Sequence, residues 1–548
     1  MYNTEMSITW AISIGLSTLL AYFFKNLYRQ RMLVKTLIKQ GLPVAPNHNF
    51  LFGHLLYLKR FSDAMPKGAH FQYMFSDIYQ ESFQDGGVFY LDMWPLSPLF
   101  LAVVSPTTAT SVTQTNSKIY ARKPDLLPKL FKPLAGGPNL FDMPEVEWKP
   151  WRATFSKCFS NEHFMYLVPG IVEQTLVYCE TLRRHAEMGD TFFLDTMTIR
   201  FTMDIIGKTI LNSELGAQRG YNPLADCMIS QMRWQQPNGD INPFSLIHLP
   251  RFFMQWLNGR RMDSYIGPEL DKRFREHRAS PPDSKKNKAI IDLLLQAYSP
   301  NSEATPNQEE TMDPEFRLFA IRQIRMFVFA GHDSTSSAIT YCFHLLSRHP
   351  KALQRLRAEH DETYGMDISS VASKLLANPA LANGLLYTTA VIKEALRLFP
   401  PASSSRQGTT GVEITDDRGM VCPTEGAVVW VNHQAMHRAP KYWVRPDDFL
   451  PERWLVSPDH ELYPMKGAWR PFENGPRNCI GQGLVMMELR IVLSLTVREF
   501  LFEDAYEEFD ARGGRKGIKN YKGERAFQID EGAAHPAEYY PCKVKLNV

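Results

Sequence analysis

One cysteine lies in a glycine-containing turn that leads directly into an apolar segment, which we expect to form a helix. The turn covers residues 472–481, F-E-N-G-P-R-N-C-I-G, and its cysteine is Cys479. A thiolate at this place would lie at the amino-terminal end of the helix, where free backbone N–H groups and the helix dipole stabilise negative charge. Both effects lower the pKa of a cysteine and favour metal ligation. The sequence therefore predicts that Cys479 is a metal ligand.

The residues around this cysteine fit a flat ligand that carries carboxylates. Gly475 allows a positive φ, Gly481 allows the backbone to approach such a ligand closely, and Arg477 can pair with a carboxylate. The pattern F-x-x-G-x-R-x-C-x-G, which begins at Phe472, resembles the heme-binding loop of the cytochrome P450 monooxygenases. That resemblance implies heme b as cofactor, with the Cys479 thiolate as axial iron ligand and with Phe472, Arg477 and Gly481 as heme-binding residues. The alternative is a buried structural cysteine in an ordinary turn.

A second informative stretch is residues 324–346, which is apolar on nearly all sides, as expected for a helix that crosses a core. Residues 332–337, H-D-S-T-S-S, interrupt it with six polar side chains in a row. An unpaired polar group in such a place costs about 1–3 kcal/mol, and Gly331 adds about 1 kcal/mol relative to alanine. A sequence that accepts these costs is expected to use the polar patch. The alternative is a solvated helix face.

Residues 330–335, A-G-H-D-S-T, resemble the distal-helix motif of the same family, A/G-G-x-D/E-T-T/S. In the family the glycine permits a local widening of the helix that makes room for O2, and the acid and the following hydroxyl deliver protons. The resemblance implies Asp333, Ser334 and Thr335 as catalytic residues. The chain departs from the pattern at Ser334, where threonine is usual, because serine keeps the hydroxyl but loses the methyl group that restricts χ1. Which of the two hydroxyls acts is left open by the sequence.

Two further motifs are expected to be structural. Glu394 and Arg397 form an E-x-x-R pair one helical turn apart, which alone is weak evidence because such pairs are common and worth only a few tenths of a kcal/mol. Residues 451–454, P-E-R-W, resemble the family's P-E-R-F/W motif, whose arginine joins the E-x-x-R pair. The resemblance implies that Glu394, Arg397 and Arg453 lock the segment before the cysteine loop.

The resemblance also implies partners for the two heme carboxylates. Trp148 and Arg152 match a W-x-x-x-R pattern on one helical face, and Arg406 follows Arg397 by nine residues. In the family these positions meet the heme propionates. With Arg477 they provide three cations for two carboxylates, although any one of these arginines alone would more often be a surface residue.

The rest of the chain must position these residues. Its 44% hydrophobic and 22% charged content is that of a globular protein, and a net charge of +3 gives no sign of nucleic-acid binding. Seven scattered cysteines without a C-x-x-C pair argue against a disulfide framework or a zinc site. Helical periodicity dominates, and short valine-rich runs at 88–90, 101–104 and 427–431 predict strands. We therefore expect a mainly α protein with a small β region, which is also the fold of the family.

The amino-terminal region is expected to be a membrane anchor. Residues 8–24 form an uncharged, largely apolar run of 17 residues, short for a spanning helix. Four basic residues follow it and only Glu5 precedes it, so the positive-inside rule puts the body in the cytosol. The basic cluster is on the wrong side for a cleaved signal peptide. We predict a single-pass anchor at 1–25, a basic and proline-rich hinge at 26–50, and a heme-thiolate catalytic domain at 51–548, held at the endoplasmic reticulum membrane.

A second element could contact a membrane. Residues 246–256 combine Phe252, Phe253, Met254 and Trp256 with flanking basic residues, which is typical of an amphipathic segment in the membrane interface. A helix packed on the core is the equally supported alternative.

The motifs occur in the order that the family requires. We therefore expect a monooxygenase that uses O2 to hydroxylate, epoxidise or otherwise oxidise an apolar small molecule. No G-x-G-x-x-G fingerprint follows a predicted strand, so electrons must come from a separate partner, which the resemblance implies is an NADPH-dependent flavoprotein reductase. The style of residues 327–337 and of the tail resembles fungal members of secondary-metabolite pathways. The alternatives are a heme-thiolate isomerase or dehydratase that needs no reductase, and a non-enzymatic heme-binding protein.

Overall fold

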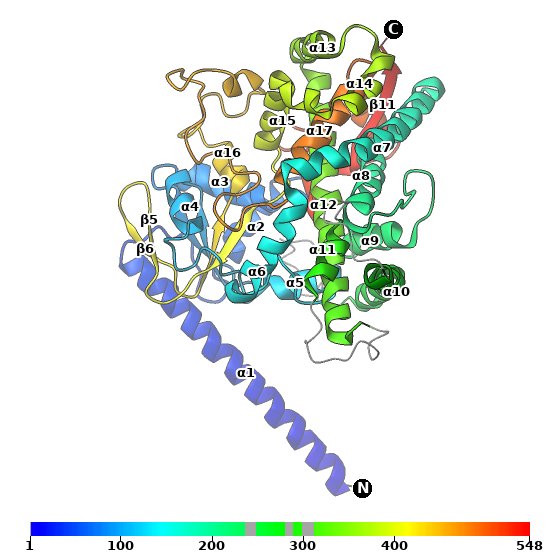
Figure 1. Ribbon diagram of the computed structural model, residues 1–548. Helices are drawn as coiled ribbons and strands as arrows, with labels where there is room; N and C mark the ends of the chain where they lie inside the picture. The colour runs from blue at the N-terminus through cyan, green and yellow to red at the C-terminus, as the bar shows by residue number, and fades with distance from the viewer. Residues whose placement is uncertain (1, 236–247, 280–288, 299–311, 548) are drawn as a thin grey trace.

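A computed structural model describes residues 2–235, 248–279, 289–298 and 312–547 of the chain. It confirms a mainly helical protein with a small β-rich part (Figure 1). The helices are α1 (Tyr2–Lys39), α2 (Leu55–Asp63), α3 (Gln72–Ser82), α4 (Pro106–Thr113), α5 (Leu127–Ala135), α6 (Glu145–Ser156), α7 (Asn161–Met188), α8 (Leu194–Leu211), α9 (Pro223–Arg233), α10 (Leu249–Ala279), α11 (Ile290–Ala297), α12 (Pro314–Arg348), α13 (Pro350–Tyr364), α14 (Val371–Ala377), α15 (Leu386–Leu398), α16 (His433–His437), α17 (Gln482–Thr496) and α18 (Tyr506–Ala511).

The predicted strands meet in one sheet. β1 (Val88–Asp92), β2 (Leu99–Val103), β7 (Ala427–Val431) and β4 (Ser404–Gln407) follow one another in that spatial order. β2 and β7 are parallel, with Leu101 opposite Val429, and the other two pairings are antiparallel. β1 and β7 are buried along their whole length, because elements cover both faces of the sheet. Their uninterrupted apolar sequences fit such a doubly covered strand.

Short β-structure elsewhere completes the smaller part. A hairpin joins β5 (Glu413–Thr415) to β6 (Val421–Pro423), and β9 (Gln528–Glu531) pairs antiparallel with β10 (Ala533–Pro536). β11 (Pro541–Leu546) lies between β3 (Phe192–Phe193) and β8 (Phe500–Asp504). The described 3-10 helices are η1 (Lys157–Phe159), η3 (Ile368–Ser370), η4 (Pro379–Gly384), η5 (Pro451–Trp454) and η6 (Ala537–Tyr539).

The long helix α12 runs through the middle of the helical part (Figure 1). It begins at a proline, with Asp313 as N-cap accepting a hydrogen bond from Phe316 N, as a helix start requires. Its side chains are buried almost all round from Ala320 to Leu346. α8 packs along it, and Thr202 of α8 donates a hydrogen bond to the carbonyl of His332 at 3.0 Å. The polar motif of α12 therefore lies inside the core.

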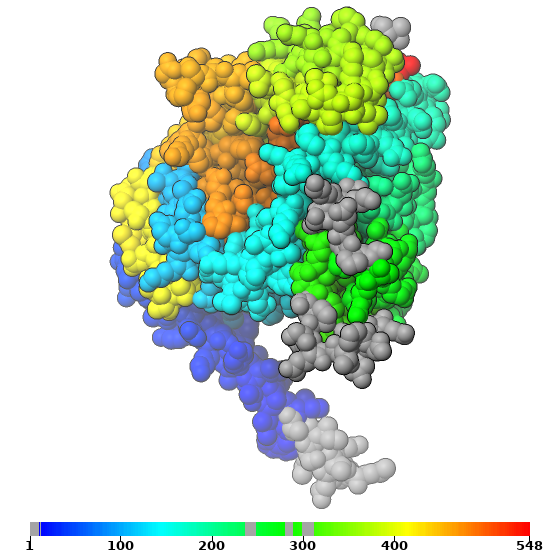
Figure 2. Space-filling model, in the orientation of Figure 1, coloured from blue at the N-terminus to red at the C-terminus, as the bar shows by residue number. Residues whose placement is uncertain are grey.

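The amino-terminal helix differs from the predicted division of the chain. α1 extends without a break from Tyr2 to Lys39, past the predicted boundary at 25/26, and projects from the body (Figures 1 and 2). The chain turns only at Gly41, which has φ +71°, because a glycine in the left-handed region is followed there by Pro43 and Pro46, which cannot continue a helix. After the turn, Ala45 N donates to Tyr90 O. Most of the predicted hinge is therefore helix, and the rest is bonded to the body.

The carboxy-terminal part of α1 is fixed to the body by a buried ion pair. Arg31 is 1% exposed and donates to Asp92 at 2.5 Å, while its other N–H groups donate to three backbone carbonyls. Farther toward the amino terminus the large apolar side chains are exposed, among them Trp10, Leu19 and Phe24. Within the part of the chain that the structure describes, no helix is long and apolar enough to cross a membrane. The predicted single membrane pass has no support there.

Candidate functional site

The cysteine loop has the geometry that its sequence predicts. Gly475 has φ +85°, and a Cβ at this position would lie 2.2 Å from the carbonyl oxygen of Thr113, so only glycine fits. Cys479 N donates to Phe472 O at 2.8 Å, which closes the turn. α17 begins three residues after the cysteine, with Gly481 as its N-cap residue. Cys479 therefore precedes a helix amino terminus directly.

The environment of the sulfur differs from the prediction in one respect. Desolvation by the surrounding protein raises the pKa of the Cys479 thiol although the residue has accessible surface, and hydrogen bonds from the backbone N–H groups of Gly481 and Gln482 and the charge of Arg152 act in the lowering direction. The expected lowering is therefore wrong for the protein groups alone, because desolvation of a thiolate outweighs two N–H donors and a cation. A metal ion bonded to the sulfur supplies the missing charge and deprotonates a thiol outright.

Cys479 differs from the other cysteines in its accessibility. All seven cysteines lie in described parts of the chain and none of them forms a disulfide; Cys479 is exposed and the other six are buried. A hollow of about 830 Å³ opens beside it, lined by residues from α6, α7, η4 and the start of α17. In Figure 2 the orange part of the chain lies at this face between the cyan and the yellow-green segments. The Cys479 thiol is thus accessible on one side and surrounded by protein on its other sides, as a cysteine that binds a ligand must be.

α6 supplies two residues that hold the cysteine loop. Trp148 is buried, and its ring centroid lies 4.1 Å from the guanidinium carbon of Arg477, within cation–π distance. One turn later, Arg152 donates to the carbonyl and the side-chain oxygen of Asn478, at 3.0 and 2.9 Å. The structure thus brings the predicted Trp148 and Arg152 to the loop that carries the cysteine.

Two of the predicted arginines, Arg406 and Arg477, form a cluster in which donor groups stay unpaired. Burial and the nearby charge of Arg406 lower the pKa of Arg477 to about 10. Arg406 is fully buried, and its Nη2, like Nε of Arg477, has no hydrogen-bond partner. Lys123 belongs to the same cluster, because burial and the charges of Arg406 and Arg477 hold its pKa well below the usual value. Buried cations with unpaired donors need an anion nearby, so the carboxylates of a heme fit this place.

Lys123 and Glu473 are two members of this region that the sequence did not identify. Lys123 stands before a proline, outside any motif. Glu473 lies within the cysteine loop, at φ +57°. Burial alone would raise the pKa of Glu473, but the nearby His433, 3.6 Å away, and the charges of Arg470 and Arg406 lower it. The positive φ of a non-glycine residue in this loop is a conformational feature that no pattern in the sequence indicates.

The polar motif of α12 is divided between buried and accessible groups. Asp333 and Thr335 are buried, whereas Ser334 keeps partial accessibility. Ser334 Oγ donates to the carbonyl of Ala330 at 3.1 Å, and Thr335 Oγ1 donates to that of Gly331 at 2.9 Å. Of the two hydroxyls that the sequence left open, Ser334 is therefore the partly accessible one.

The glycine of this motif has a packing function. α12 is a regular α-helix through Gly331, without the widening that the motif led us to expect. A Cβ at Gly331 would lie 2.2 Å from Cδ1 of Ile206 in α8. The close approach of the two helices is therefore the physical reason for glycine here.

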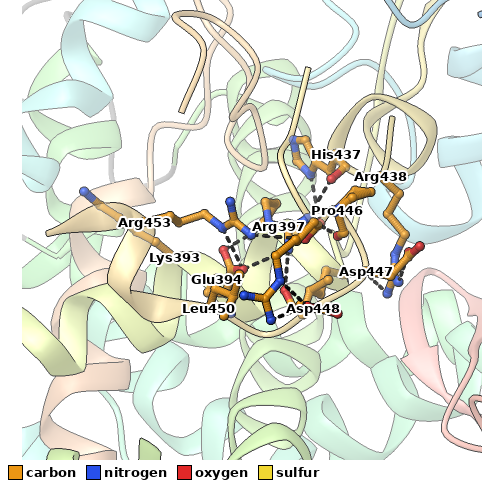
Figure 3. Close-up of polar contacts among 12 residues, drawn as sticks. Lys393, Glu394, Arg397, His437, Arg438, Pro446, Asp447, Asp448, Leu450 and Arg453 are labelled. Carbon is orange, nitrogen blue, oxygen red and sulfur yellow. Dashed lines mark hydrogen bonds and ion pairs between the residues drawn. The ribbon is translucent and has the colours of Figure 1, made fainter. Parts of the chain in front are cut away.

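The E-x-x-R motif and its partner form a buried ionic centre (Figure 3). Glu394 accepts from Nε and Nη2 of Arg397 at 3.0 and 2.8 Å, and from Nε of Arg453 at 2.9 Å. All three side chains are buried completely. Leu450 N and Trp454 Nε1 also donate to Glu394. The cluster ties α15 to the segment before the cysteine loop and offers no open position to a ligand.

Comparison with known proteins shows the family to which the chain belongs. The family model described as Cytochrome P450 matches residues 43–511. Cytochrome P450 monooxygenase polC of Polytolypa hystricis is 39% identical over 98% of this chain and 96% of its own. Cytochrome P450 monooxygenase acrF of Aspergillus aculeatus is 31% identical over 87% of this chain and 98% of its own. The crystal structure of a cytochrome P450DA heme domain matches the fold with a TM-score of 0.66 and 19% identity, over 92% of this chain and 98% of that one.

Proposed function

The chain belongs to the cytochrome P450 family, and on that premise we propose how its residues serve a heme-dependent monooxygenase. The observation that carries the proposal is the accessible Cys479 at the start of α17 beside a cluster of buried, unpaired cations. When bound, the heme b activates O2, so that one oxygen atom enters the substrate and the other leaves as water. The protein residues hold the heme, orient it and move protons toward it.

Cys479 is the axial ligand and the cations bind the carboxylates. Arg406, Arg477 and Lys123 have the unpaired or mutually repelling charges that an anion would neutralise. Trp148 and Arg152 orient the loop from α6. Their different contacts predict different roles: loss of Arg477 weakens heme retention directly, whereas loss of Arg152 frees the loop.

Ser334 is the hydroxyl that delivers protons, with Asp333 as its acid. A serine hydroxyl can donate and accept at once, as a relay requires. The partial accessibility of Ser334 and the complete burial of Thr335 support this choice. Ser334 is free to exchange its bond to Ala330 O for one to a ligand, because a hydroxyl rotates about one bond.

Electrons come from NADPH through a separate flavoprotein reductase. The hollow beside Cys479 is the place where such a partner approaches the thiolate side, and Arg152 and Arg490 are among its lining residues. Cations there would attract an acidic partner surface.

We also propose that the protein is held at the endoplasmic reticulum membrane with its body in the cytosol. The exposed apolar side chains of α1 support contact with lipid, as do the exposed Phe252, Phe253 and Trp256 at the start of α10. In Figure 1, α1 extends below the body and α10 lies in its lower part. The proposed divisions are an anchor at 1–25, a connection at 26–50 and a catalytic domain at 51–548. Deletion of residues 2–26 should release protein from a carbonate-washed membrane pellet; full-length protein that is already soluble would contradict this.

The substrate is an apolar small molecule of fungal secondary metabolism. Relatives in Polytolypa, Aspergillus and Penicillium species support a fungal origin. Hydroxylation and epoxidation are both within the chemistry proposed for the site.

The experiment that tests the function combines a spectrum with turnover. The ferrous carbon monoxide complex should show the red-shifted Soret band of a thiolate ligand, and Cys479→Ser should abolish it, whereas Cys422→Ser, a buried cysteine outside the loop, should keep it. NADPH and reductase should then support oxygen insertion. Turnover without NADPH would indicate an isomerase or dehydratase, and a thiolate band without any turnover would indicate a heme-binding protein that is not an enzyme.

A further inference from the structure

Three ionisable side chains from distant parts of the chain form a buried row beside the polar motif of α12. His535 of β10 lies between two aspartates: its Nδ1 is 2.9 Å from Asp195 Oδ2 at the start of α8, and its Nε2 is 3.0 Å from Asp333 Oδ1. None of the three side chains is more than 4% exposed. The acid of the proposed relay is therefore bonded to a histidine 202 positions away in the sequence.

The outer oxygens of the row are occupied as well. Ala533 N donates to Asp333 Oδ2 at 2.5 Å, and Thr340 Oγ1 donates to Asp195 Oδ1 at 3.3 Å. Three of the four carboxylate oxygens thus have a donor of their own, and Asp195 Oδ1 shares the proton of the Thr340 hydroxyl with Ser336 O, which lies 3.0 Å from that hydroxyl. Asp333 cannot turn without breaking two hydrogen bonds, one to the ring and one to the backbone of the same strand.

The geometry favours a doubly protonated ring. A neutral imidazole would direct a lone pair at one of the two carboxylates, whereas an imidazolium donates to both. Burial alone would lower the pKa of His535, but the charges and hydrogen bonds of Asp195 and Asp333 raise it well above the usual value. The other titratable groups that face the row are His332 of α12, which is itself buried with a lowered pKa, and Glu531 of β9.

β10 is also fastened to α12 beyond the histidine. Ser337 Oγ donates to Ala534 O at 2.6 Å, and Ala534 N donates to Pro401 O at 2.8 Å. The strand therefore has a fixed position relative to the helix. His535 is therefore held in place by a fixed strand, and we expect its removal to change the position of Asp333 first.

We propose that His535 is a positioning residue for the oxidation: through its bridge from Asp195 it holds the Asp333 carboxylate in one orientation and in its charged form next to Ser334. The inference rests on the proposed role of Asp333 in proton delivery and adds a residue to it. Asp195 has the outer place in the row, where it balances the ring charge. The E-x-x-R centre, by contrast, contains no group of this row.

A double-mutant cycle in the holoenzyme tests the proposal. Product and hydrogen peroxide are measured per NADPH consumed for wild type, His535→Ala, Asp333→Asn and the double variant. His535→Ala should cut product several-fold and raise peroxide, and the double variant should be no worse than Asp333→Asn alone, because His535 acts through Asp333. If the losses of product in the two single variants multiply in the double variant, the two residues act independently and the proposal is wrong. If His535→Ala does not retain heme, His535→Gln, whose amide cannot carry the charge, takes its place in the cycle.

A stability measurement supplies a readout other than activity. Without the ring, two buried carboxylates face each other and their pKa values rise, so the folded variant binds more protons than its unfolded chain below those values. In wild type the ring itself adds little pH dependence between about pH 5 and 6, because it is largely protonated in both its folded and its unfolded state, and the contributions of other buried histidines cancel in the difference between wild type and variant. The gap in thermal midpoint between wild type and His535→Ala should therefore widen as the pH is raised across this range. In the Asp333→Asn background this widening should largely vanish; a gap that is constant with pH in both backgrounds would contradict the charge pairing.

The matched control is His344 of α12, a second buried histidine that pairs with a carboxylate, in this case Glu524 at 3.2 Å. His344→Ala should lower stability but leave product per NADPH unchanged, so an equal uncoupling in His344→Ala would assign the effect to general loosening of α12 and overturn the proposal. If Asp333→Asn itself leaves the coupling unchanged, the proposed proton delivery fails. If Asp333→Asn uncouples and His535→Ala does not, only the role of His535 fails.

Discussion

The guanidinium carbon of Arg477 lies 4.1 Å from the centre of the Trp148 ring. The same guanidinium donates through Nη2 to Met143 O at 2.6 Å. A ring against one face and a carbonyl at one edge hold the group in a fixed plane, while Nε stays without a partner. Arg477 is thus oriented in advance for one further acceptor, which a flexible lysine could not provide.

Arg477→Lys is therefore expected to weaken heme binding although the charge is kept. The loss of a charge-assisted bond of this kind is worth about 1–3 kcal/mol, so heme should leave roughly tenfold faster or more. The measurement is the rate of heme transfer to an excess of an apo-globin. Arg498→Lys, at a buried arginine outside the cluster that pairs with Asp361, is the control. Equal rates for both variants would show that Arg477 does not contact the heme.

The local features of the site could be predicted from the sequence because short spacing determines them. Gly475, Arg477 and Cys479 lie in one turn, so their mutual placement follows from that turn alone. The strand runs and the long core helix were predictable for a similar reason, since periodicity is a local property.

The remaining features depend on which distant segments meet. Lys123 reaches the arginine cluster only because the sheet brings residues near 123 and 406 together, as the bond from Gln407 N to Arg122 O illustrates. His535 reaches Asp333 only through the placement of β10. α1 continues past residue 25, where the predicted anchor ends, because the basic residues after the apolar run are also good helix formers. The local sequence around Lys123 and His535 does not show which distant segment each residue will contact.

Ser334→Ala is expected to uncouple the enzyme more than Thr335→Ala. Ser334 is accessible, whereas Thr335 is fully buried and bonded to Gly331 O. Loss of a group that transfers protons costs about 10²–10⁴-fold in the step it serves. Product and peroxide per NADPH should therefore move strongly for Ser334→Ala and little for Thr335→Ala. The reverse ranking would move the role to Thr335, and two silent variants would leave Asp333 to act through water.

Glu394→Gln is expected to destabilise the fold without a direct effect on the site. The change would leave Arg397 and Arg453 buried without a carboxylate, which costs about 3–5 kcal/mol in comparable cases. Urea denaturation followed by the Soret band should show a clearly lower midpoint. Glu452→Gln is the control, because Glu452 is 43% exposed and its ion pair with Arg355 lies at the surface, where such pairs are worth at most about 1 kcal/mol.

His54 is expected to contribute to acid denaturation. Its Nδ1 accepts from Asp92 N and its Nε2 bonds to Ala45 O, both at 2.8 Å, so the ring is held neutral. Burial, partly offset by the bond to Ala45, lowers its pKa to about 4. The unfolded chain titrates at about 6.5 and so binds more protons below that value. Stability is therefore kept above pH 6.5 and falls as the pH drops toward 4, by an amount of order 3 kcal/mol from this residue.

The variant His54→Gln isolates this contribution from other buried histidines with the same direction. The fall in thermal midpoint between pH 7 and 4.5 should be shallower in His54→Gln than in wild type. His460→Gln, at an exposed position, should leave the slope unchanged. An identical slope in all three proteins would mean that His54 is not held neutral.

Gly331→Ala tests the contact between α8 and α12. In an isolated helix the change would stabilise by about 1 kcal/mol, but the new Cβ would lie 2.2 Å from Cδ1 and 2.6 Å from Cγ1 of Ile206. Forcing a methyl group into such a contact costs about 1–3 kcal/mol, so the net effect should be destabilising. Gly170→Ala in α7 is the matched control, because its nearest atom there is a lysine Cγ at 3.6 Å, and it should be neutral or stabilising.

The double variant Gly331→Ala/Ile206→Ala decides whether the clash is the cause. Ile206→Ala alone should cost about 2–5 kcal/mol through the cavity it leaves. In the double variant the methyl group added at position 331 would fill part of that cavity, so the combined loss in free energy of unfolding should be smaller than the sum of the two single losses. A sum that is simply additive would show that the helices separate around the added methyl group rather than collide at Ile206. A Gly331→Ala protein as stable as Gly170→Ala would remove packing as the reason for this glycine and would restore the widened helix expected from the motif.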